Sequence, residues 1–255
     1  MNRVSACIVT YNNKDKVAET IQSIFEHTAG VELQLFVVDN CSSDGTADFI
    51  ENAFDRVTVI RAKRNAGFGA GHNMVLPFLE SDYHVVINPD ILLKTDALSE
   101  LASYAQEHTD VGLLSPKIIF PDGSEQILGK KNPTVRYLGG HRISKKGGEI
   151  SPLMKEYCML DMPEGEPFEI SNASGCFMFF RTDVFKKLGG FDERFFMYLE
   201  DCDIARRAAE ISKVLYFPSV EVVHLWERAS KTSKKLLLVH VQSIIKYFLK
   251  WGIKF

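Results

Sequence analysis

The sequence predicts an α/β protein built on a mostly parallel central sheet with helices on both faces. Short β-branched runs alternate with helical patterns along the first half of the chain. These runs are apolar at nearly every position, which is typical of parallel strands that are buried on both faces. With 255 residues the chain is long enough for one large domain with a sizeable core.

The predicted elements begin at the N-terminus with a strand at 4–10, an unbroken apolar run. The helix predicted at 14–26 follows, because Val17, Ile21 and Ile24 recur at helical spacing. The same alternation predicts strands at 33–38, 57–61 and 85–87 and helices at 45–54, 69–79 and 95–108.

The second half of the chain is less regular. Pro, Gly and Lys are frequent between 121 and 168, and the poor periodicity there predicts a mobile excursion, a lid or acceptor loop within the domain. Regular patterns return with a strand at 169–181, helices at 183–188 and from Glu200, and strands at 214–217 and 220–224. We therefore expect one domain over 1–227 and a C-terminal helix over 228–255.

Composition narrows the class of protein. A content of 45% hydrophobic and 25% charged residues, with a net charge of −3, is ordinary for a soluble protein. The five cysteines include no C-x-x-C motif and predict neither a disulfide framework nor a zinc site. No signal peptide precedes the first predicted strand, and no apolar run approaches the ~20 residues that span a bilayer. We expect a cytoplasmic protein that binds no nucleic acid.

Polar clusters follow four of the predicted strands. In open sheets of this class, ligands bind beyond the carboxyl ends of the strands. The clusters are Thr10-Tyr11-Asn12, residues 39–46, residues 64–73 and Asn88-Pro89-Asp90. If the predicted sheet is correct, all four clusters line one crevice.

Two of these clusters, and His224 in a later strand, allow a second interpretation. Glycines at 67–71 let the backbone approach a ligand and Arg64 can meet a phosphate, but the run lacks the last glycine of a dinucleotide-binding loop and also fits a plain loop. Asn88 and Asp90 offer oxygen ligands to a divalent cation, or form an Asx-Pro turn. His224 is either a buried, hydrogen-bonded side chain or a ligand of a metal or phosphate.

An acidic triplet, Glu200, Asp201 and Asp203, follows an aromatic run. Carboxylates are favourable at a helix start, where the free N–H groups and the helix dipole attract negative charge. Carboxylates behind an apolar wall also suit a general base with a shifted pKa. On these residues alone, the cap and the base both remain open.

The C-terminal tail is basic and amphipathic. Residues 228–255 carry seven basic side chains and no acidic ones, so the first 227 residues have a net charge of −10. An apolar stripe is formed by Leu237, Val241, Ile244, Phe248, Trp251 and Phe255, with Lys246, Lys250 and Lys254 opposite. Such a helix fits a membrane interface, and it equally fits docking on the core or on a second copy of the chain in a homodimer.

Taken together and in this order, the motifs resemble family 2 glycosyltransferases, and most of all rhamnosyltransferase-like members that build bacterial O-antigen and capsule chains. The motifs are Thr10-Tyr-Asn, Asp39-Asn-x-Ser-x-Asp44-Gly-Thr, Arg64-Asn-x-Gly-Phe-Gly, Asn88-Pro-Asp90 and the run 189–203. The resemblance covers about residues 3–228. It implies a GT-A fold and an inverting transfer of a sugar, with dTDP-rhamnose the first candidate donor, to a glycan or polyprenyl-linked acceptor.

The resemblance also implies roles for individual residues. Asp201 would be the general base with Glu200 beside it in the acceptor site, Asp90 with Asn88 would hold Mg²⁺ or Mn²⁺, and His224 would be a further contact of the metal or the diphosphate. Donor binding would fall to Thr10, Tyr11, Asp39 and Asp44 at the nucleoside and to Arg64, Gly67 and Gly69 near the diphosphate. Asn88 stands where the family's motif has an aspartate, so the predicted metal site has one anionic ligand fewer.

Two other classes of function remain as alternatives. A sugar-phosphate nucleotidyltransferase also binds nucleotides on an α/β sheet, but its Gly-rich, Arg-Lys loop after the first strand is absent, and Thr10-Tyr11-Asn12 stands there. A non-catalytic, membrane-associated glycan-binding protein is the other. For a transferase with a polyprenyl-linked acceptor, we expect the tail to hold the protein peripherally on the inner face of the cell membrane.

Overall fold

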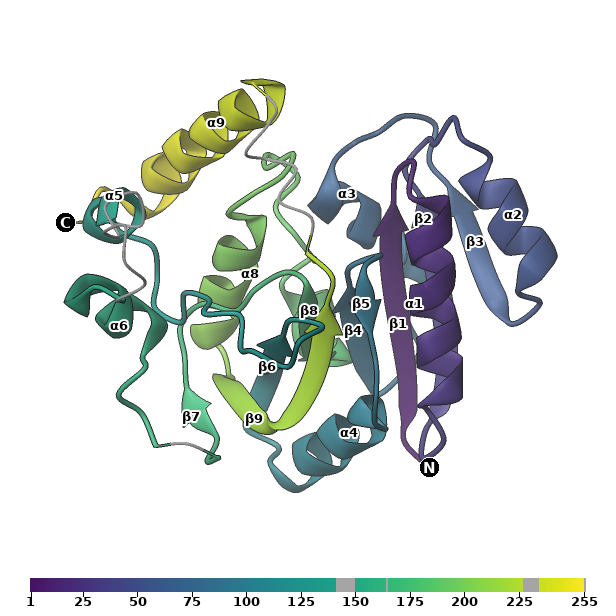
Figure 1. Ribbon diagram of the computed structural model, residues 1–255, viewed down its shortest axis with the longest axis horizontal. Coiled ribbons are helices and arrows are strands. Elements are labelled where there is room, and N and C mark those ends of the chain that lie inside the picture. Colours follow the sequence, from purple (N-terminus) through teal and green to yellow (C-terminus); the bar gives the residue numbers. More distant parts are fainter. Residues whose placement is uncertain (141–149, 164, 227–233, 255) are drawn as a thin grey trace.

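A single nine-stranded sheet organises the computed structural model, which describes residues 1–140, 150–163, 165–226 and 234–254 (Figure 1). The strand order is β3-β2-β1-β4-β8-β6-β9-β5, and β7 pairs with β9. The strands are β1 (Arg3–Thr10), β2 (Glu32–Asp39), β3 (Val57–Arg61), β4 (Tyr83–Ile87), β5 (Ile91–Leu92), β6 (Val111–Ile119), β7 (Phe168–Glu169), β8 (Phe177–Arg181) and β9 (Lys213–His224). The helices are α1 (Lys14–Glu26), α2 (Thr46–Ala53), α3 (Phe68–Asn73), η1 (Leu76–Phe78), α4 (Ala97–Glu107), α5 (Val135–Gly140), α6 (Pro152–Cys158), α7 (Thr182–Lys187), α8 (Glu200–Ala209) and α9 (Lys234–Trp251).

The first half of the sheet is parallel, as predicted. β1 pairs in parallel with both β2 and β4, and β2 pairs in parallel with β3. The carboxyl ends of these strands therefore meet at one edge, at the top of the sheet in Figure 1. This edge carries the polar clusters that the sequence analysis singled out.

The second half of the sheet is mixed. β8 lies antiparallel between β4 and β6, and β9 runs parallel to β6. Because β8 runs against its neighbours, its N-terminal end meets the carboxyl ends of β4, β6 and β9. The segment that leads into β8 is thereby placed at the same edge as the polar clusters, and so is the end of β9.

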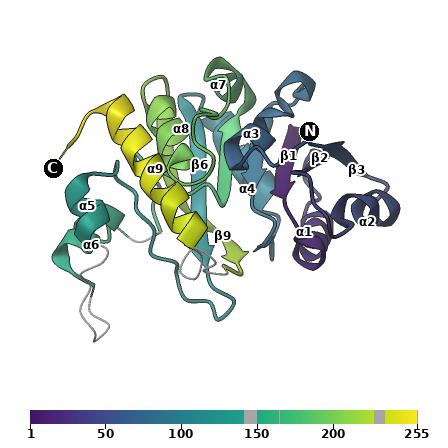
Figure 2. The same ribbon diagram turned by 90° about the horizontal axis from the view of Figure 1, so that it is seen from above.

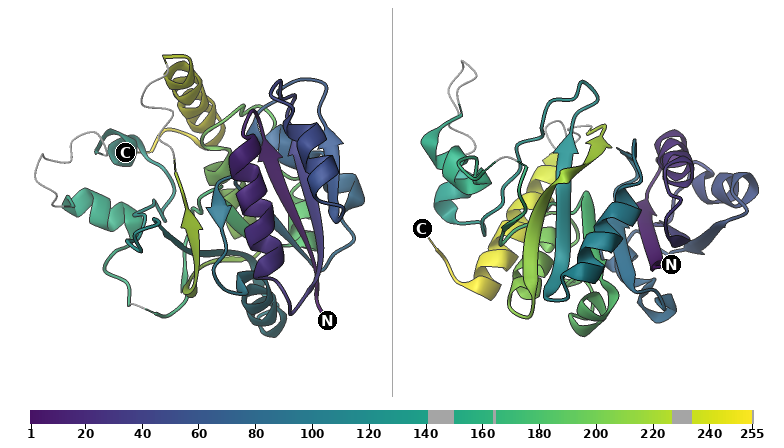
Figure 3. Two further views of the ribbon diagram at one scale, coloured as in Figure 1. Left: turned by 45° about the vertical axis from the view of Figure 1, so that its right-hand side comes forward. Right: turned by 90° about the horizontal axis from the view of Figure 1, so that it is seen from below.

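Helices cover both faces of the sheet and enclose two cores. Along β1, Ala6 and Ile8 pack in the core under α1, α2 and α4, while Cys7 and Val9 pack in the core under α3, α7 and α8. Figure 3 shows α1 lying along β1, and Figure 2 shows α9 running beside α8. Nearly every position of β1, β4 and β8 is therefore buried, which explains their continuous apolar runs.

The excursion at 121–168 contains two helices that the sequence did not predict, α5 and α6. They pack on each other through Tyr137 and Tyr157, whose ring centroids lie 4.8 Å apart. Residues 141–149 and 164 of this segment lie outside the described residues. The mobility of the segment stays a prediction.

The predicted C-terminal helix is present as α9, and its apolar stripe differs from the expected one. Ile244, Phe248 and Trp251 pack with buried Tyr247 against α8 and the loop before it, so they face protein and are not available to a membrane. Leu237 and Val241 of the predicted stripe are exposed, and so are Leu238, Ile245 and Leu249, which were not placed on it. Phe255, also placed on the stripe, lies outside the described residues.

The three lysines expected opposite the stripe do not form one solvent-facing row. Lys246 donates to the carbonyl of Arg194, and Lys250 pairs with Asp192 and Asp203. No helix in the described ranges is long and apolar enough to cross a bilayer.

Candidate active site

A cavity of about 550 Å³ opens at the carboxyl ends of β1, β4 and β9. Most of the residues that were predicted to form a site line it, although they come from distant parts of the sequence. These residues are Thr10, Tyr11, Gly67, Asn88, Asp90, Glu200, Asp201 and His224. The edge created by the strand order brings them together.

Four predicted donor-binding residues do not line this cavity. Asp44 accepts hydrogen bonds from the backbone and hydroxyl of Thr46 at the start of α2, and that hydroxyl lowers the pKa of Asp44. At Gly69, a Cβ atom would come within 2.6 Å of the Cβ of Phe191, so this glycine permits close packing. Arg64 is exposed.

Asp39, the fourth, ends β2 next to Asn40, which does line the cavity. Its Oδ2 accepts from the backbone N–H of Ser42 at 3.0 Å. Its Oδ1 and the hydroxyl of Thr10 are buried and have no hydrogen-bond partner within the described part of the chain. Because buried polar atoms normally have partners, these two oxygens are candidates for contact with a polar ligand.

Asp90 and His224 form a pair of candidate metal ligands. Ile91 pairs with His224 between β5 and β9, which places Asp90 against the histidine ring. The Oδ1 atom of Asp90 lies 3.4 Å from Nε2 of His224, and the side chains are 17% and 9% exposed. Two donor atoms this close can share one cation.

The side chains of Asp90, His224 and Asn88 suit a divalent ion that also binds a diphosphate. No group of three or more His, Cys, Asp and Glu side chains among the described residues is arranged to hold a metal. Mg²⁺ typically takes one or two protein carboxylates and completes its shell with substrate phosphates and water. Asp90 and His224, with the amide of Asn88 nearby on the cavity wall, meet that requirement.

The chain enters α8 through two strained residues. Tyr198 and Leu199 have φ angles of 70° and 62°, in the left-handed region that side chains rarely adopt. This turn directs Asp201 toward the segment before β8. The backbone N–H of Gly175 donates to Oδ2 of Asp201 at 2.9 Å, and that of Cys202 donates to Oδ1 at 2.8 Å. The carboxylate is thus fixed at both oxygens.

Glu200 lies beside Asp201 and differs from it electrostatically. It is 5% exposed, and burial together with the charge of Asp201 raises its pKa well above the usual range. Its Oε2 accepts no hydrogen bond from the residues that the structure describes. Burial therefore favours the neutral, protonated form of Glu200, which can donate a hydrogen bond.

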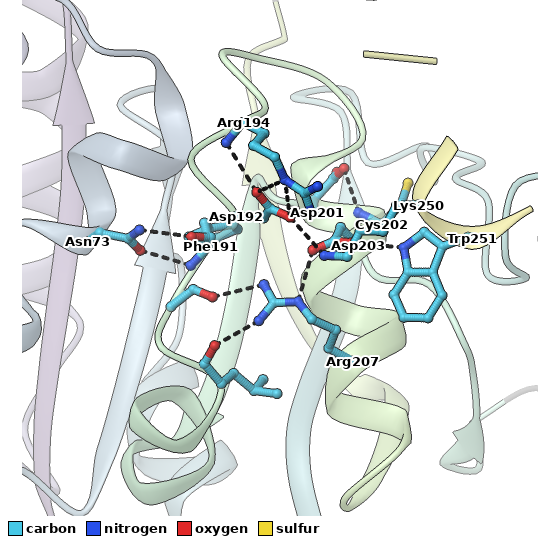
Figure 4. Close-up of polar contacts among 12 residues, drawn as sticks. Asn73, Phe191, Asp192, Arg194, Asp201, Cys202, Asp203, Arg207, Lys250 and Trp251 are labelled. Atoms are coloured by element: carbon cyan, nitrogen blue, oxygen red, sulfur yellow. Dashed lines mark hydrogen bonds and ion pairs between the residues drawn. The ribbon is translucent and has the colours of Figure 1, made fainter. Parts of the chain in front are cut away.

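Asp203, expected to be part of the helix cap, has a different role. It lies in the first turn of α8, but its fully buried carboxylate binds the side chains of Arg207, Lys250 and Trp251 at 2.7–2.8 Å (Figure 4). The residue at the N-cap position of α8, Leu199, makes no capping hydrogen bond with its side chain. Asp203 instead anchors α9 to α8.

Several residues of the site were not predicted. Asn40 donates to Asn65 and to the carbonyl of Gly67 and accepts from Ala66, so it orders the loop before α3. Gly175 reaches the cavity because β8 is antiparallel, which no local pattern reveals. For Asn40, its position directly after a strand was the one available signal, because an asparagine amide there can hydrogen-bond the backbone of a neighbouring loop.

Comparison with known proteins finds relatives of this chain in both sequence and structure. A family model described as "Glycosyl transferase family 2" matches residues 5–189. An N-acetylglucosaminyl-diphospho-decaprenol L-rhamnosyltransferase from Mycobacterium tuberculosis is 28% identical over 207 residues, which are 75% of this chain and 66% of that protein. Rhamnosyltransferase WbbL from Escherichia coli K12 is 23% identical over 194 residues, 72% and 70% of the two chains. The chain thus spans about two thirds of the length of these relatives.

Solved structures agree in fold. A mannosyltransferase from Pyrobaculum calidifontis, in complex with GDP-Man and Mn²⁺, has a TM-score of 0.66 at 18% identity and covers 97% of this chain and 64% of its own. GalNAc-T7 with UDP, GalNAc and Mn²⁺ has a TM-score of 0.67 at 15% identity and covers 90% and 44%. These likenesses confirm the predicted GT-A fold.

Proposed function

Because the chain belongs to glycosyl transferase family 2, we propose that it transfers a sugar from a nucleotide-diphosphate donor to a glycan or lipid-linked glycan acceptor, with inversion at the sugar carbon. Rhamnose from dTDP-rhamnose is the first candidate, supported by the relatives named as rhamnosyltransferases. One observation carries the proposal. The fixed carboxylate of Asp201 and the Asp90–His224 pair line the same cavity.

In this proposal Asp201 is the general base. Its two backbone hydrogen bonds hold the carboxylate in place and leave a lone pair on each oxygen to take the proton of an acceptor hydroxyl. Glu200, kept neutral by burial, donates a hydrogen bond to a substrate oxygen. Thr10 and Asp39 meet the nucleoside with their unpaired oxygens.

Asp90 and His224, with Asn88, would hold Mg²⁺ or Mn²⁺ in this proposal. When bound, the ion offsets negative charge on the departing diphosphate. The backbone around Gly67 can approach the same group closely, since no side chain covers it.

Replacing Asp201 with Asn tests the proposal. The amide keeps the size of the side chain but cannot take a proton, so transfer falls by about 10²–10⁴-fold while binding of dTDP-rhamnose is retained. The matched control is Asp183→Asn at the start of α7. Asp183 likewise accepts from the next backbone N–H but lies outside the cavity. Near-normal turnover in the Asp201 variant would show that the base is assigned wrongly.

Two further incubations separate the alternatives. Formation of a nucleotide-sugar from a nucleoside triphosphate and a sugar phosphate would identify a nucleotidyltransferase. Release of no nucleotide from any sugar donor, in the presence of Mn²⁺ and a range of acceptors, would favour a non-catalytic glycan-binding protein.

The outer face of α9, formed by Leu238, Val241, Ile245 and Leu249, is proposed to bind an anionic membrane at the cytoplasmic side. These side chains are 42–81% exposed and recur every three or four residues. The tail carries seven basic residues and no acidic ones, which complements anionic lipid. A relative named for a decaprenol-linked acceptor is consistent with this location.

Sedimentation with phosphatidylglycerol vesicles tests this surface. The Leu238→Ser/Leu249→Ser double variant is expected to lose vesicle binding, whereas Phe78→Ser, an exposed apolar residue elsewhere, keeps it. Deleting α9 is unsuitable, because Tyr247 is fully buried. Unchanged binding by the double variant overturns the proposal, and a homodimer that the double variant disrupts would identify a second copy as the occupant.

A further inference from the structure

The two ring nitrogens of His224 have different neighbours. Nε2 faces Asp90, as described above, and Nδ1 lies 3.0 Å from Oε1 of Gln126. Gln126 follows β6, is 2% exposed and does not line the cavity. It therefore contacts the candidate metal ligand through the ring nitrogen that does not face Asp90.

The amide of Gln126 has only one favourable orientation. Its nitrogen lies 2.8 Å from the carbonyl oxygen of His224 and 3.5 Å from that of Ile119. Carbonyl oxygens only accept hydrogen bonds, so the NH₂ group must face them. The remaining amide atom, Oε1, is then directed at Nδ1 of His224.

This orientation determines which nitrogen of His224 carries the proton. An amide oxygen cannot donate, so Nδ1 must carry a hydrogen and donate to Oε1 of Gln126. In the neutral ring, Nε2 then has a free lone pair, aimed at the carboxylate of Asp90. Two acceptors 3.4 Å apart repel one another unless a cation lies between them. Trp226, nearly parallel to the imidazole at 17°, further restrains the ring plane.

We propose that Gln126 is a positioning residue that holds His224 in the Nδ1–H tautomer and so presents Nε2, together with Asp90, to a divalent cation. The proposal rests on the proposed function in one respect, the metal at Asp90 and His224. Metal-ligating histidines commonly donate their other N–H to such an acceptor, and its loss costs about 10–100-fold in metal affinity.

Two substitutions at Gln126 isolate the accepting oxygen. Gln126→Met keeps the length of the side chain but accepts no strong hydrogen bond. Gln126→Glu loses the NH₂ group as well, yet a carboxyl oxygen still accepts from Nδ1 in either protonation state. Both variants remove the amide donor to the carbonyl of His224, and only Gln126→Glu keeps an oxygen that accepts from Nδ1.

The readout is the tautomer of His224 in the metal-free protein at pH 8, measured from imidazole ¹⁵N chemical shifts and assigned with a His224→Gln variant. We expect the Nδ1–H form in the wild type and in Gln126→Glu, and its loss in Gln126→Met. Titration with Mn²⁺ alone, followed by broadening of the His224 signals, should show at least tenfold weaker binding in Gln126→Met and recovery in Gln126→Glu. An Nε2–H or doubly protonated ring in the wild type overturns the inference, as does a Met variant that keeps both tautomer and affinity.

Asp90→Ala separates this inference from the proposed function. That variant is expected to keep the Nδ1–H tautomer while losing Mn²⁺ binding. If the tautomer depends on Gln126 but Mn²⁺ broadens the His224 signals in neither the wild type nor Asp90→Ala, the metal role of the proposed function fails while the hydrogen-bond assignment stands.

Discussion

Gly67 joins the loop before α3 to the loop before α8. Its φ is 97°, and a Cβ atom there would lie 2.1 Å from the carbonyl oxygen of Phe196. The same oxygen accepts from the N–H of Phe68 at 2.9 Å. One glycine therefore permits the contact between a segment proposed to meet the donor and the segment that carries Asp201.

We expect Gly67→Ala to destabilise the protein by about 3 kcal/mol or more, because it adds a steric clash to backbone strain of ~1–3 kcal/mol. Gly45→Ala is the matched control, since Gly45 also has a positive φ of 78° but nothing lies within 4 Å of its Cβ position. It should cost only about 1–2 kcal/mol. Urea unfolding measures both values, and equal losses would mean that the contact with Phe196 contributes nothing.

At the scale of single residues, the sequence predicted those site residues whose position is determined by the end of one strand. Thr10 ends the first predicted strand, Asn88 and Asp90 come just after the strand predicted at 85–87, and all three line the cavity. Asp44 and Gly69 belong to the same motifs, but local structure explains both. Asp44 accepts hydrogen bonds in the turn before α2, and Gly69 permits close packing against Phe191. A motif lists residue types and does not distinguish these uses.

Among the elements, α9 is tied to α8 by buried charge. Asp203 accepts from Nε1 of Trp251 at 2.8 Å and pairs with Lys250 and Arg207 (Figure 4). Ser243 donates to the carbonyl of Met197, and Lys246 to that of Arg194. α9 thus supports the loop that leads to Asp201 and Glu200.

Trp251→Phe should lower the free energy of unfolding by about 1.5–3 kcal/mol. The variant keeps a ring under Arg206 but removes one donor from a buried carboxylate. Leu249→Ala on the same helix is the control, because the leucine is 81% exposed. Chemical denaturation compares the two, and a smaller loss in Trp251→Phe than in the control would contradict the anchoring role.

The elements that the sequence predicted are those with a regular local pattern. The helix at 14–26 and the strand at 57–61 agree with α1 and β3 to the residue. β6 was missed because Pro116 interrupts it, and the structure places this proline at a register shift between β6 and β9. The antiparallel insertion of β8 depends on pairing with strands far away in the sequence. The alternation of strand and helix patterns along the chain does not reveal such pairing.

For the whole molecule, two buried histidines predict sensitivity to acid. Burial lowers the pKa of His84 to about 3 and that of His72 well below its usual range. The unfolded chain takes up these protons near pH 6.5, before the folded protein does. Above pH 6.5 both histidines are neutral in the folded and the unfolded state, and the fold keeps its full stability. As the pH falls from 6.5 toward the folded pKa values, the unfolded chain binds protons that the folded protein does not, and stability is lost.

His72→Leu tests this prediction. Neither ring nitrogen of His72 has a partner in the part of the chain that the structure describes, and the rings of Phe68 and Phe191 lie against it. We expect the variant to be at least as stable at pH 8, and its stability to fall less steeply with pH by about 1.4 kcal/mol per unit between pH 6 and 4. Unfolding in urea across this range gives both slopes, and parallel slopes would refute the role of His72.

Three hydrogen bonds between the α3 region and the loop before α8 end on backbone atoms of that loop. Phe68 bonds the carbonyl of Phe196, and the side chain of Asn73 bonds both the N–H and the carbonyl of Phe191. Backbone groups are the same whatever side chain they carry. For protein engineering, side chains of this loop can therefore be exchanged without loss of these three hydrogen bonds, provided that Gly67 and Asn73 are retained.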